Sequence, residues 1–360
     1  MGTDENRQTR RQGAREDFVR DTWYPVLESK RLGRRPVGVT RLGRKLVLWR
    51  DAQGQPVAQE AACPHRGADL SKGRVVSGCL ECPYHGLRFA ADGACVRVPC
   101  EGDARPIRAD LRVKGFVVRE GLGLVWLWWG EERNELPPLP WNHELPEAGA
   151  GSCTATLTWN VPFARVMEGN LDLHHFPFAH RRWAPGLGTL LDPYTARLEG
   201  DVIHTRGVLR RDDGKPWDGR SGFVAEIRVL FPHLVLLRFG SLTQGMAAAT
   251  PIDEENTWVV FRYRSSLPLL GGLVAWFLVR TEVGLIQPED YALLRDSEPR
   301  HPTREDFHLV RADAGIALWF RMYERRLEAQ RRALPSGEGV ESPEQGVHTS
   351  GEWGGDRASG

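Results

Sequence analysis

Two short segments of the chain each place one cysteine and one histidine beside a proline and a glycine. The first segment, CPHRG, contains Cys63 and His65, and the second, CPYHG, contains Cys82 and His85. Thiolates and imidazoles bind soft and borderline metals, so four of them in two matched segments suit tetrahedral zinc or an iron–sulfur cluster. We therefore interpret these four residues as candidate metal ligands.

The spacing of the ligands bears on the choice between zinc and iron. Cys79 forms a Cys-X-X-Cys pair with Cys82, which would suit zinc, but only one residue separates Cys63 from His65. Structural zinc sites usually have longer gaps, whereas two loops that each give one thiolate and one imidazole match the ligand set of a Rieske [2Fe–2S] centre. The other cysteines are expected to be ordinary thiols without a metal: Cys79, Cys95, Cys100 and Cys153.

A histidine-rich segment further along the chain, MEGNLDLHHFPFAHRRW, could hold a second metal. Asp172 and His175 are three residues apart and would share a face of a helix expected at residues 164–175. Pro177 would end that helix, and the chain could then bring His180 back toward His175. Two imidazoles and one carboxylate with open positions form the facial triad of non-haem Fe(II) oxygenases. The alternative for any one of these histidines is an ordinary polar residue.

The chain resembles the oxygenase (alpha) subunits of Rieske non-haem iron oxygenases in both segments. CPHRG and CPYHG are similar to the two cluster-binding loops of that family, and D-X-X-H-X-X-X-X-H is similar to its iron-site motif. The resemblance runs from the WYPVLES segment at Trp23 to the helix around Tyr323. Within the family, the chain looks most like the group of pheophorbide a oxygenase and the O-demethylating monooxygenases.

The resemblance implies ligands for two metal centres. For the [2Fe–2S] cluster they are Cys63 and Cys82 on one iron and His65 and His85 on the other; for a mononuclear Fe(II) they are His175, His180 and a distant acid. His174 is a rival for a ligand position, but it would point about a quarter-turn away from its neighbour on a helix.

The same resemblance assigns roles to two aspartates. Asp172 occupies the position of the family's bridging aspartate, which joins an iron-bound histidine to a Rieske histidine across a subunit boundary; the alternative is an acid on a helix surface. The third iron ligand in the family is an aspartate near the start of a late helix, and QPEDYALLRD offers Asp290, with Pro288 placed to open the helix. Glu289 and Asp296 are the other candidates. Glu289 and Asp290 could instead complement the helix dipole.

The chain departs from the family pattern at a few positions. Some members carry an asparagine four residues before the bridging aspartate, where this chain has Glu168, and Asn170 lies two residues before it. We assign no role to either residue. Leu87 follows the second cluster loop where a tryptophan is common.

The distribution of elements predicts two domains. Short strands and turn signals fill residues 18–134, which indicates an all-β domain with the cluster loops in its turns, and a proline-rich linker follows at 135–151. Residues 152–333 mix strands with helices, expected at 289–295 and 306–332, so the fold class is α+β. The resemblance implies a Rieske domain followed by a helix-grip (START/Bet v1-like) domain with an antiparallel sheet. The ends, residues 1–17 and 334–360, are expected to be disordered.

Composition limits the partners. Net charge is +1, with both signs interspersed, which argues against nucleic acid. The N-terminus lacks the apolar core of a signal peptide, so we expect a cytoplasmic protein. Residues 267–279 are apolar but shorter than the ~20 of a spanning helix. We expect a buried element or substrate-channel wall there, with membrane-surface contact as the alternative, and we expect no membrane contact overall. Basic residues at 30–45 could dock an acidic ferredoxin or form a solvated face.

The function that the resemblance implies is that of a terminal oxygenase component. Electrons from NAD(P)H would arrive through a reductase, with or without a ferredoxin, and pass through the Rieske cluster to a mononuclear Fe(II). There O2 would hydroxylate, demethylate or cleave a small apolar or aromatic substrate. A homotrimer is implied, with electron transfer between neighbouring chains. The alternative is a Rieske electron-transfer protein whose second domain binds a ligand without catalysis.

Overall fold

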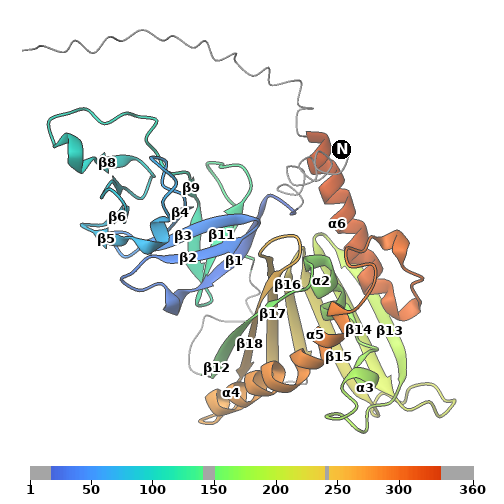
Figure 1. Ribbon diagram of the computed structural model, residues 1–360. Coiled ribbons are helices and arrows are strands. Elements are labelled where there is room, and N and C mark those ends of the chain that lie inside the picture. Colours follow the sequence, from blue (N-terminus) through green and yellow to red (C-terminus); the bar gives the residue numbers. More distant parts are fainter. Residues whose placement is uncertain (1–17, 141–150, 240–242, 334–360) are drawn as a thin grey trace, which may run out of the picture.

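The computed structural model describes residues 18–140, 151–239 and 243–333 (Figure 1). In these ranges the chain forms three small antiparallel sheets followed by one antiparallel sheet of seven strands. The α+β class expected from the sequence is therefore confirmed. The tails expected to be disordered, 1–17 and 334–360, lie outside the described residues, as does most of the expected linker.

Two of the small sheets form the body of the N-terminal region. Their orders are β1-β11-β10 and β2-β3-β4-β9. Apolar side chains from both sheets meet in one core, because alternate residues of each strand point inward. The strands are β1 (Thr22–Glu28), β2 (Val37–Arg41), β3 (Arg44–Arg50), β4 (Pro56–Glu60), β9 (Gly115–Phe116), β10 (Val118–Gly121) and β11 (Leu124–Trp129).

The third small sheet, with order β5-β6-β7-β8, carries one of the two cluster loops. CPYHG connects β6 to β7, and CPHRG lies between β4 and a short 3-10 turn at Leu70–Lys72. Trp49, Leu80 and Phe89 pack beneath these loops in a separate small core. The strands are β5 (Arg74–Val76), β6 (Cys79–Glu81), β7 (Arg88–Phe89) and β8 (Cys95–Arg97).

The seven-stranded sheet has the order β12-β18-β17-β16-β15-β14-β13. Its two edge strands, β12 and β13, are therefore consecutive in the sequence. Its most buried strand, β18, reads TWVVFRYRS and is buried on both faces, as expected for a strand covered on both sides. The strands are β12 (Ser152–Trp159), β13 (Leu190–Glu199), β14 (Val202–Arg210), β15 (Phe223–Leu230), β16 (Leu234–Phe239), β17 (Thr243–Pro251) and β18 (Thr257–Ser265).

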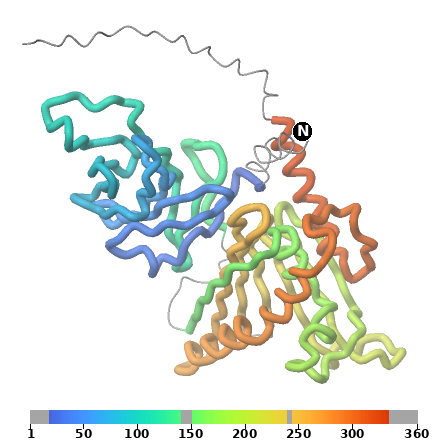
Figure 2. Tube along the Cα trace, viewed as in Figure 1, coloured from blue at the N-terminus to red at the C-terminus, as the bar shows by residue number. Residues whose placement is uncertain are grey.

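Helices cover one face of this sheet (Figure 1). Trp319 and Phe320 of the long C-terminal helix and Phe163 of the first helix share a core with inward side chains of the strands. The chain from 271 to 295 is continuously helical, with a π-helical segment in the middle, and can be followed in orange in Figure 2. The helices are α2 (Phe163–Leu171), α3 (Phe176–Ala179), α4 (Gly271–Thr281), η5 (Glu282–Ile286, π-helical), α5 (Gln287–Arg295) and α6 (Ala314–Ala333).

Two sequence predictions about this region are wrong. The helix predicted at 306–332 begins only at Ala314, because Asp306 and Asp313 accept the backbone N–H groups of Thr303 and Val310 and form two separate 3-10 turns first. The apolar run at 267–279 is not a buried element, since most of its large side chains are exposed.

The opposite face of the seven-stranded sheet packs on the N-terminal region. Trp23, Trp126 and Trp128 of the three-stranded sheet share one buried cluster with outward residues of β16, β17 and β18, such as Met246 and Trp258. Polar contacts fix the same junction, for the Thr250 hydroxyl donates to the Pro25 carbonyl at 2.6 Å. The seven-stranded sheet therefore lies between its helices and the region that carries the cluster loops.

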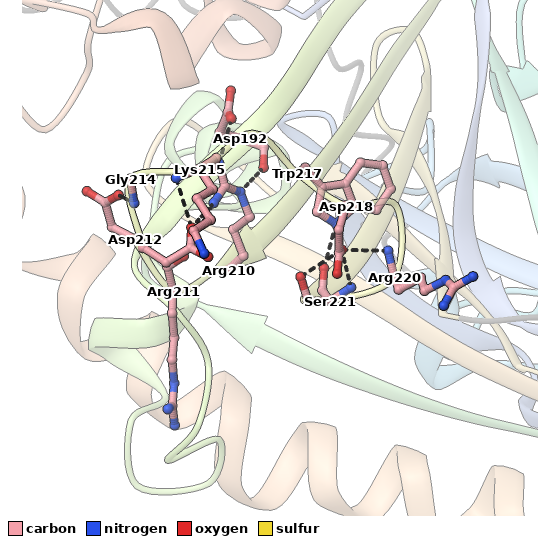
Figure 3. A network of polar contacts seen from close by, with 11 residues as sticks. Asp192, Arg210, Arg211, Asp212, Gly214, Lys215, Trp217, Asp218, Arg220 and Ser221 are labelled. Atoms are coloured by element: carbon pink, nitrogen blue, oxygen red, sulfur yellow. Dashed lines mark hydrogen bonds and ion pairs between the residues drawn. The ribbon is translucent and has the colours of Figure 1, made fainter.

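Arg210, at the end of β14, anchors the loop that leads to β15 (Figure 3). Its buried guanidinium donates to the Asp192 side chain at 3.0 Å and to the Lys215 carbonyl at 2.9 Å. Further along the loop, the Asp218 carboxylate accepts the backbone N–H groups of Arg220 and Ser221. These bonds close the loop at the edge of the sheet that β13 and β14 form.

Candidate metal centres

The two cluster loops have the same backbone conformation. In each loop the glycine N–H donates to the carbonyl of the cysteine four residues earlier, from Gly67 to Cys63 at 2.8 Å and from Gly86 to Cys82 at 3.1 Å. Both glycines have a positive φ, 73° and 70°, a region that other residues rarely adopt. The near-repeat in the sequence is thus a repeat in the structure.

The thiols and imidazoles of these loops lie at different depths. Cys63 and Cys82 are both 3% exposed, whereas His65 is exposed and its ring lies 4.7 Å from that of the half-buried His85. Burial raises the pKa of the Cys63 thiol to about 11, and the nearby Cys82 thiol adds to the rise. Two inner sulfurs beneath two outer imidazoles match the donor set of a two-iron cluster in which one iron has cysteine ligands and the other has histidine ligands. Cys79, which would pair with Cys82 if the metal were zinc, lies in β6 outside the two loops.

The second site begins where α2 ends. The sequence predicted one helix over 164–175, but α2 ends at Leu171 and Asp172 is extended. The reason is local: the Asp172 carboxylate accepts the backbone N–H groups of His174 and His175 at 2.8 and 3.3 Å, which competes with the helical hydrogen bonds. A new short helix, α3, then starts after His175.

Pro177 has a different role from the one predicted. It lies in the first turn of α3, where a proline is well tolerated, rather than at the end of a helix. The single turn of α3 brings His180 to its end, so the rings of His175 and His180 lie 5.1 Å apart. The two predicted histidine ligands thus come together because they lie at the two ends of the short helix α3 and not because they share one face of a long helix.

Asp290 completes a group of three. It lies in the first turn of α5, which contains Pro288 as predicted, and its Oδ1 is 3.4 Å from His175 Nε2 and 3.2 Å from His180 Nε2. The three ligand atoms lie within 4.8 Å of one another. Ligands that each lie about 2.1 Å from one metal ion are separated by about 3–4 Å, so this spacing suits a shared ion.

Each histidine has a second carboxylate behind it. His175 Nδ1 lies 3.3 Å from Asp172 Oδ2, and His180 Nδ1 lies 2.9 Å from Glu289 Oε2. A carboxylate at Nδ1 fixes the tautomer and orients Nε2 toward a metal. Both Nε2 atoms are buried and lack a well-directed hydrogen bond among the described residues. Two imidazole nitrogens that face the Asp290 carboxylate but form no such hydrogen bond suit the ligands of a metal ion.

The electrostatics also favour a cation. Burial opposes charge on His175, but the carboxylates of Asp172 and Asp290 outweigh it and raise the pKa of His175 to about 9. Burial likewise opposes charge on Asp290, and the two histidines outweigh it and lower the pKa of that carboxyl. A divalent ion would satisfy these carboxylates in place of a proton.

The other sequence candidates lie outside this group of three. His174 Nε2 is 2.9 Å from Asp313 Oδ1 and 3.3 Å from Asp172 Oδ1, and it is not one of the three converging ligand atoms. Asp296 forms an exposed ion pair with Arg295. Glu289 is adjacent to the group, behind His180, and it also accepts the indole N–H of Trp183 at 3.2 Å.

The two residues without an assigned role have structural partners. Glu168 forms a 2.6 Å ion pair with the buried Arg165, and the Asn170 amide donates to the Val166 carbonyl at 2.8 Å. Sequence reasoning also missed Glu282, a carboxyl that accepts hydrogen bonds from Tyr263 and Gln287. Burial raises the pKa of Glu282. No motif marks this residue, and only its contacts reveal it.

Comparison with known proteins agrees with this geometry. Residues 22–114 match the family model described as the Rieske [2Fe-2S] domain. The chain is 31% identical over 258 residues to the 3-chlorobenzoate-3,4-dioxygenase oxygenase subunit of Comamonas testosteroni, covering 68% of this chain and 58% of the relative. It is 36% identical over 199 residues to the oxygenase component of dicamba O-demethylase from Stenotrophomonas maltophilia, covering 54% of this chain and 55% of the relative. The chain thus spans somewhat more than half the length of these relatives.

Solved structures share the fold. The crystal structure of dicamba monooxygenase bound to dicamba matches with a TM-score of 0.71 and 23% identity, over 88% of this chain and 99% of that one. NdmA from Pseudomonas putida CBB5 matches with a TM-score of 0.66 and 22% identity, over 87% and 92% of the two chains. Residues 22–114 therefore match a Rieske [2Fe–2S] domain, and the chain is similar to relatives that are named as the oxygenase subunit or component of their systems.

Proposed function

We propose that the protein is the terminal oxygenase component of a multicomponent Rieske oxygenase. The observation that carries the proposal is the convergence of His175, His180 and Asp290 on one point, in a chain that also contains a Rieske domain. An Fe(II) held there would supply O2 activation with open coordination positions, and the Rieske cluster would supply electrons one at a time. Cys63, His65, Cys82 and His85 would hold that cluster.

In this proposal, side chains around the triad position its ligands. Asp172 and Glu289 would keep the protons of His175 and His180 on Nδ1, so that both Nε2 atoms face the ion. Asp172 is also partly exposed, so it could hydrogen-bond a Rieske histidine of a neighbouring chain. A homotrimer is part of the proposal for this reason, as is the division into a cluster domain at 18–134 and an iron domain at 152–333.

The substrate class follows from relatives whose names state their substrates. They include dicamba O-demethylase and a 5,5'-dehydrodivanillate O-demethylase that is 31% identical over 196 residues. We propose a small aromatic or apolar substrate and an outcome of hydroxylation, demethylation or cleavage. Electrons would come from NAD(P)H through a reductase or ferredoxin, and the protein would act in the cytoplasm.

Iron content tests this function against an electron carrier with a non-catalytic second domain. We expect about three irons per chain, two in the cluster and one at the triad, together with the electron paramagnetic resonance signal of a reduced Rieske centre. The reduced protein, exposed to O2 with a panel of aromatic ethers and acids, should form an oxygenated product. Two irons per chain and no product from any member of the panel would favour the electron carrier.

The two carboxylates behind the histidines allow a matched test of electron transfer. Asp172→Asn and Glu289→Gln each remove one charge beside one iron ligand, so both should lower iron affinity by about 10–100-fold. With iron supplied in excess, only Asp172→Asn should still slow reoxidation of the reduced Rieske centre in a single turnover. Equal reoxidation rates in the two variants would show that Asp172 does not bridge the centres.

A further inference from the structure

Helix α4 presents a broad apolar surface to solvent. Leu273, Trp276 and Phe277 are 64%, 49% and 62% exposed, and Leu269 and Leu270 at the start of the helix are 106% and 57% exposed. Isolated apolar residues on a surface are ordinary, but a contiguous patch of this kind marks a binding surface. The helical run continues from α4 through η5 into α5, which carries Asp290.

The packing of α4 explains why so much of it faces outward. It lies against β12 and β18 through a stripe of small or β-branched residues, Gly271, Ala275 and Val279, which are its only buried positions. A Cβ on Gly271 would lie 2.5 Å from the Ser265 carbonyl oxygen, so the helix rests close against the sheet. The remaining arc of the helix is apolar from Gly272 to Leu278, and its polar residues, Arg280 and Thr281, lie only at its C-terminal end.

The segment that forms this surface carries a single charge, which is positive. Between residues 266 and 281 the sequence contains no Asp, Glu or Lys, and its one charged residue is Arg280, whose guanidinium lies 5.6 Å from the Trp276 ring centroid. The next acid, Glu282, is turned inward to Tyr263 and Gln287. Tryptophan beside arginine at the rim of an apolar surface is typical of protein at a membrane–water interface.

A second segment has the same character. Phe178 and Trp183 are 63% and 47% exposed, and the Arg182 guanidinium lies 5.9 Å from the Trp183 ring centroid. Residues 173–191 contain arginines and no acid. The Trp183 indole donates to Glu289 of α5, and Figure 1 shows α3 and α4 at the same lower end of the molecule.

From these observations we infer that α4, together with the segment 178–183, is a surface that binds an anionic phospholipid bilayer. Apolar side chains would enter the acyl boundary, while the arginines would contact lipid phosphates. Among the described residues, no helix has both the length and the apolar composition needed to cross a membrane, so the contact would be peripheral. The inference reverses the sequence expectation of no membrane contact and stands apart from the proposed function.

Vesicle flotation tests the inference without turnover. The full chain, with its metals, is mixed with vesicles of phosphatidylcholine and phosphatidylglycerol and with vesicles of phosphatidylcholine alone. We expect the wild type to float with the anionic vesicles. The triple variant Leu273→Gln, Trp276→Gln, Phe277→Gln should bind about 1000-fold more weakly, since each of the three large apolar side chains contributes on the order of tenfold.

A matched control keeps the result specific. The triple variant Val96→Gln, Leu198→Gln, Val310→Gln replaces exposed apolar residues outside the patch, which are 48%, 44% and 60% exposed, and it should bind like the wild type. Rieske absorbance and melting temperature report folding of every variant. A wild type that stays unbound, or α4 and control variants that lose binding equally, would overturn the inference. So would a wild type that fails to float and whose oligomer mass falls in the α4 variant, because a second copy would then cover the patch.

Discussion

Replacing His175 by alanine should abolish substrate oxygenation while leaving the Rieske absorbance and electron paramagnetic resonance spectra unchanged. The variant loses one of the three atoms that converge at the triad, and the remaining two, from His180 and Asp290, cannot fix a facial geometry. We expect product formation to fall by at least about 100-fold and the iron content to fall by about one per chain.

The adjacent residue provides the control. His174→Ala removes an imidazole of the same kind that contacts Asp313 and Asp172 but is not one of the three converging ligands, so this variant should keep the third iron. Iron analysis and product formation are measured on both variants in parallel. Normal turnover by His175→Ala, or loss of the third iron from His174→Ala but not from His175→Ala, would contradict the proposed ligand set.

The second large effect concerns stability at acid pH and depends on His233. This residue is 1% exposed at the junction of the N-terminal region with the seven-stranded sheet, where its Nε2 lies 2.6 Å from the Trp23 carbonyl oxygen and its ring stacks on Tyr24. Burial lowers the pKa of His233 to about 4 from the 6.5 of an exposed histidine. The folded protein therefore excludes a proton that the unfolded chain accepts.

The sign of the effect follows from this difference. Above pH 6.5 His233 is neutral in both the folded and the unfolded chain, and its contribution to stability is fully present. As the pH falls from 6.5 to 4, His233 takes up a proton only in the unfolded chain, so the free energy of unfolding decreases. The loss amounts to about 3 kcal/mol of unfolding free energy, at about 1.4 kcal/mol per pH unit. Urea unfolding between pH 7 and pH 4.5, followed by tryptophan fluorescence, measures it.

A variant that keeps the hydrogen bond isolates the titration. His233→Gln retains an N–H donor for the Trp23 carbonyl and has no charge to gain, so its stability should fall less between pH 7 and pH 4.5 than that of the wild type. His204→Gln, at a partly exposed histidine of the same sheet, should behave as the wild type does. An unchanged pH dependence in His233→Gln would show that other groups cause the loss.

Local patterns in the sequence were enough to predict the cluster loops. Each loop contains its ligands, its proline and its glycine within five residues, and its turn is closed by a bond from Gly67 to Cys63 or from Gly86 to Cys82. No contact from a distant part of the chain is needed to form such a turn. The family resemblance and the loop geometry therefore agree.

The triad depended on contacts that no local pattern shows. Glu289 and His180 are 109 residues apart in the sequence. The sequence therefore left both Glu289 and Asp290 as candidates for the third ligand. Only the structure shows that Glu289 lies behind His180. The predicted helix through Asp172 failed because a side chain competed with the backbone for the N–H groups of two later residues.

Local preference does not predict every strand of the large sheet. β17, TQGMAAATP, contains three alanines and one glycine, and its only β-branched residues are two threonines near its ends, so the local signal for a strand is weak. It forms because β16 and β18 pair with it on both sides and because Met246 and Ala248 are buried against the N-terminal region. Long-range pairing of this kind overrides weak local preference.

The buried cluster of Trp23, Trp126, Trp128, Met246 and Trp258 limits how this protein can be recombined with its relatives. The N-terminal region cannot be exchanged as an independent unit, because half of the residues in this buried group belong to the outer face of the seven-stranded sheet. A chimera that imports a foreign Rieske domain would have to import matching side chains on β16, β17 and β18 as well. Under the proposed function, a new electron donor is therefore better accommodated by substitutions on the exposed tip of the cluster loops than by exchange of the whole domain.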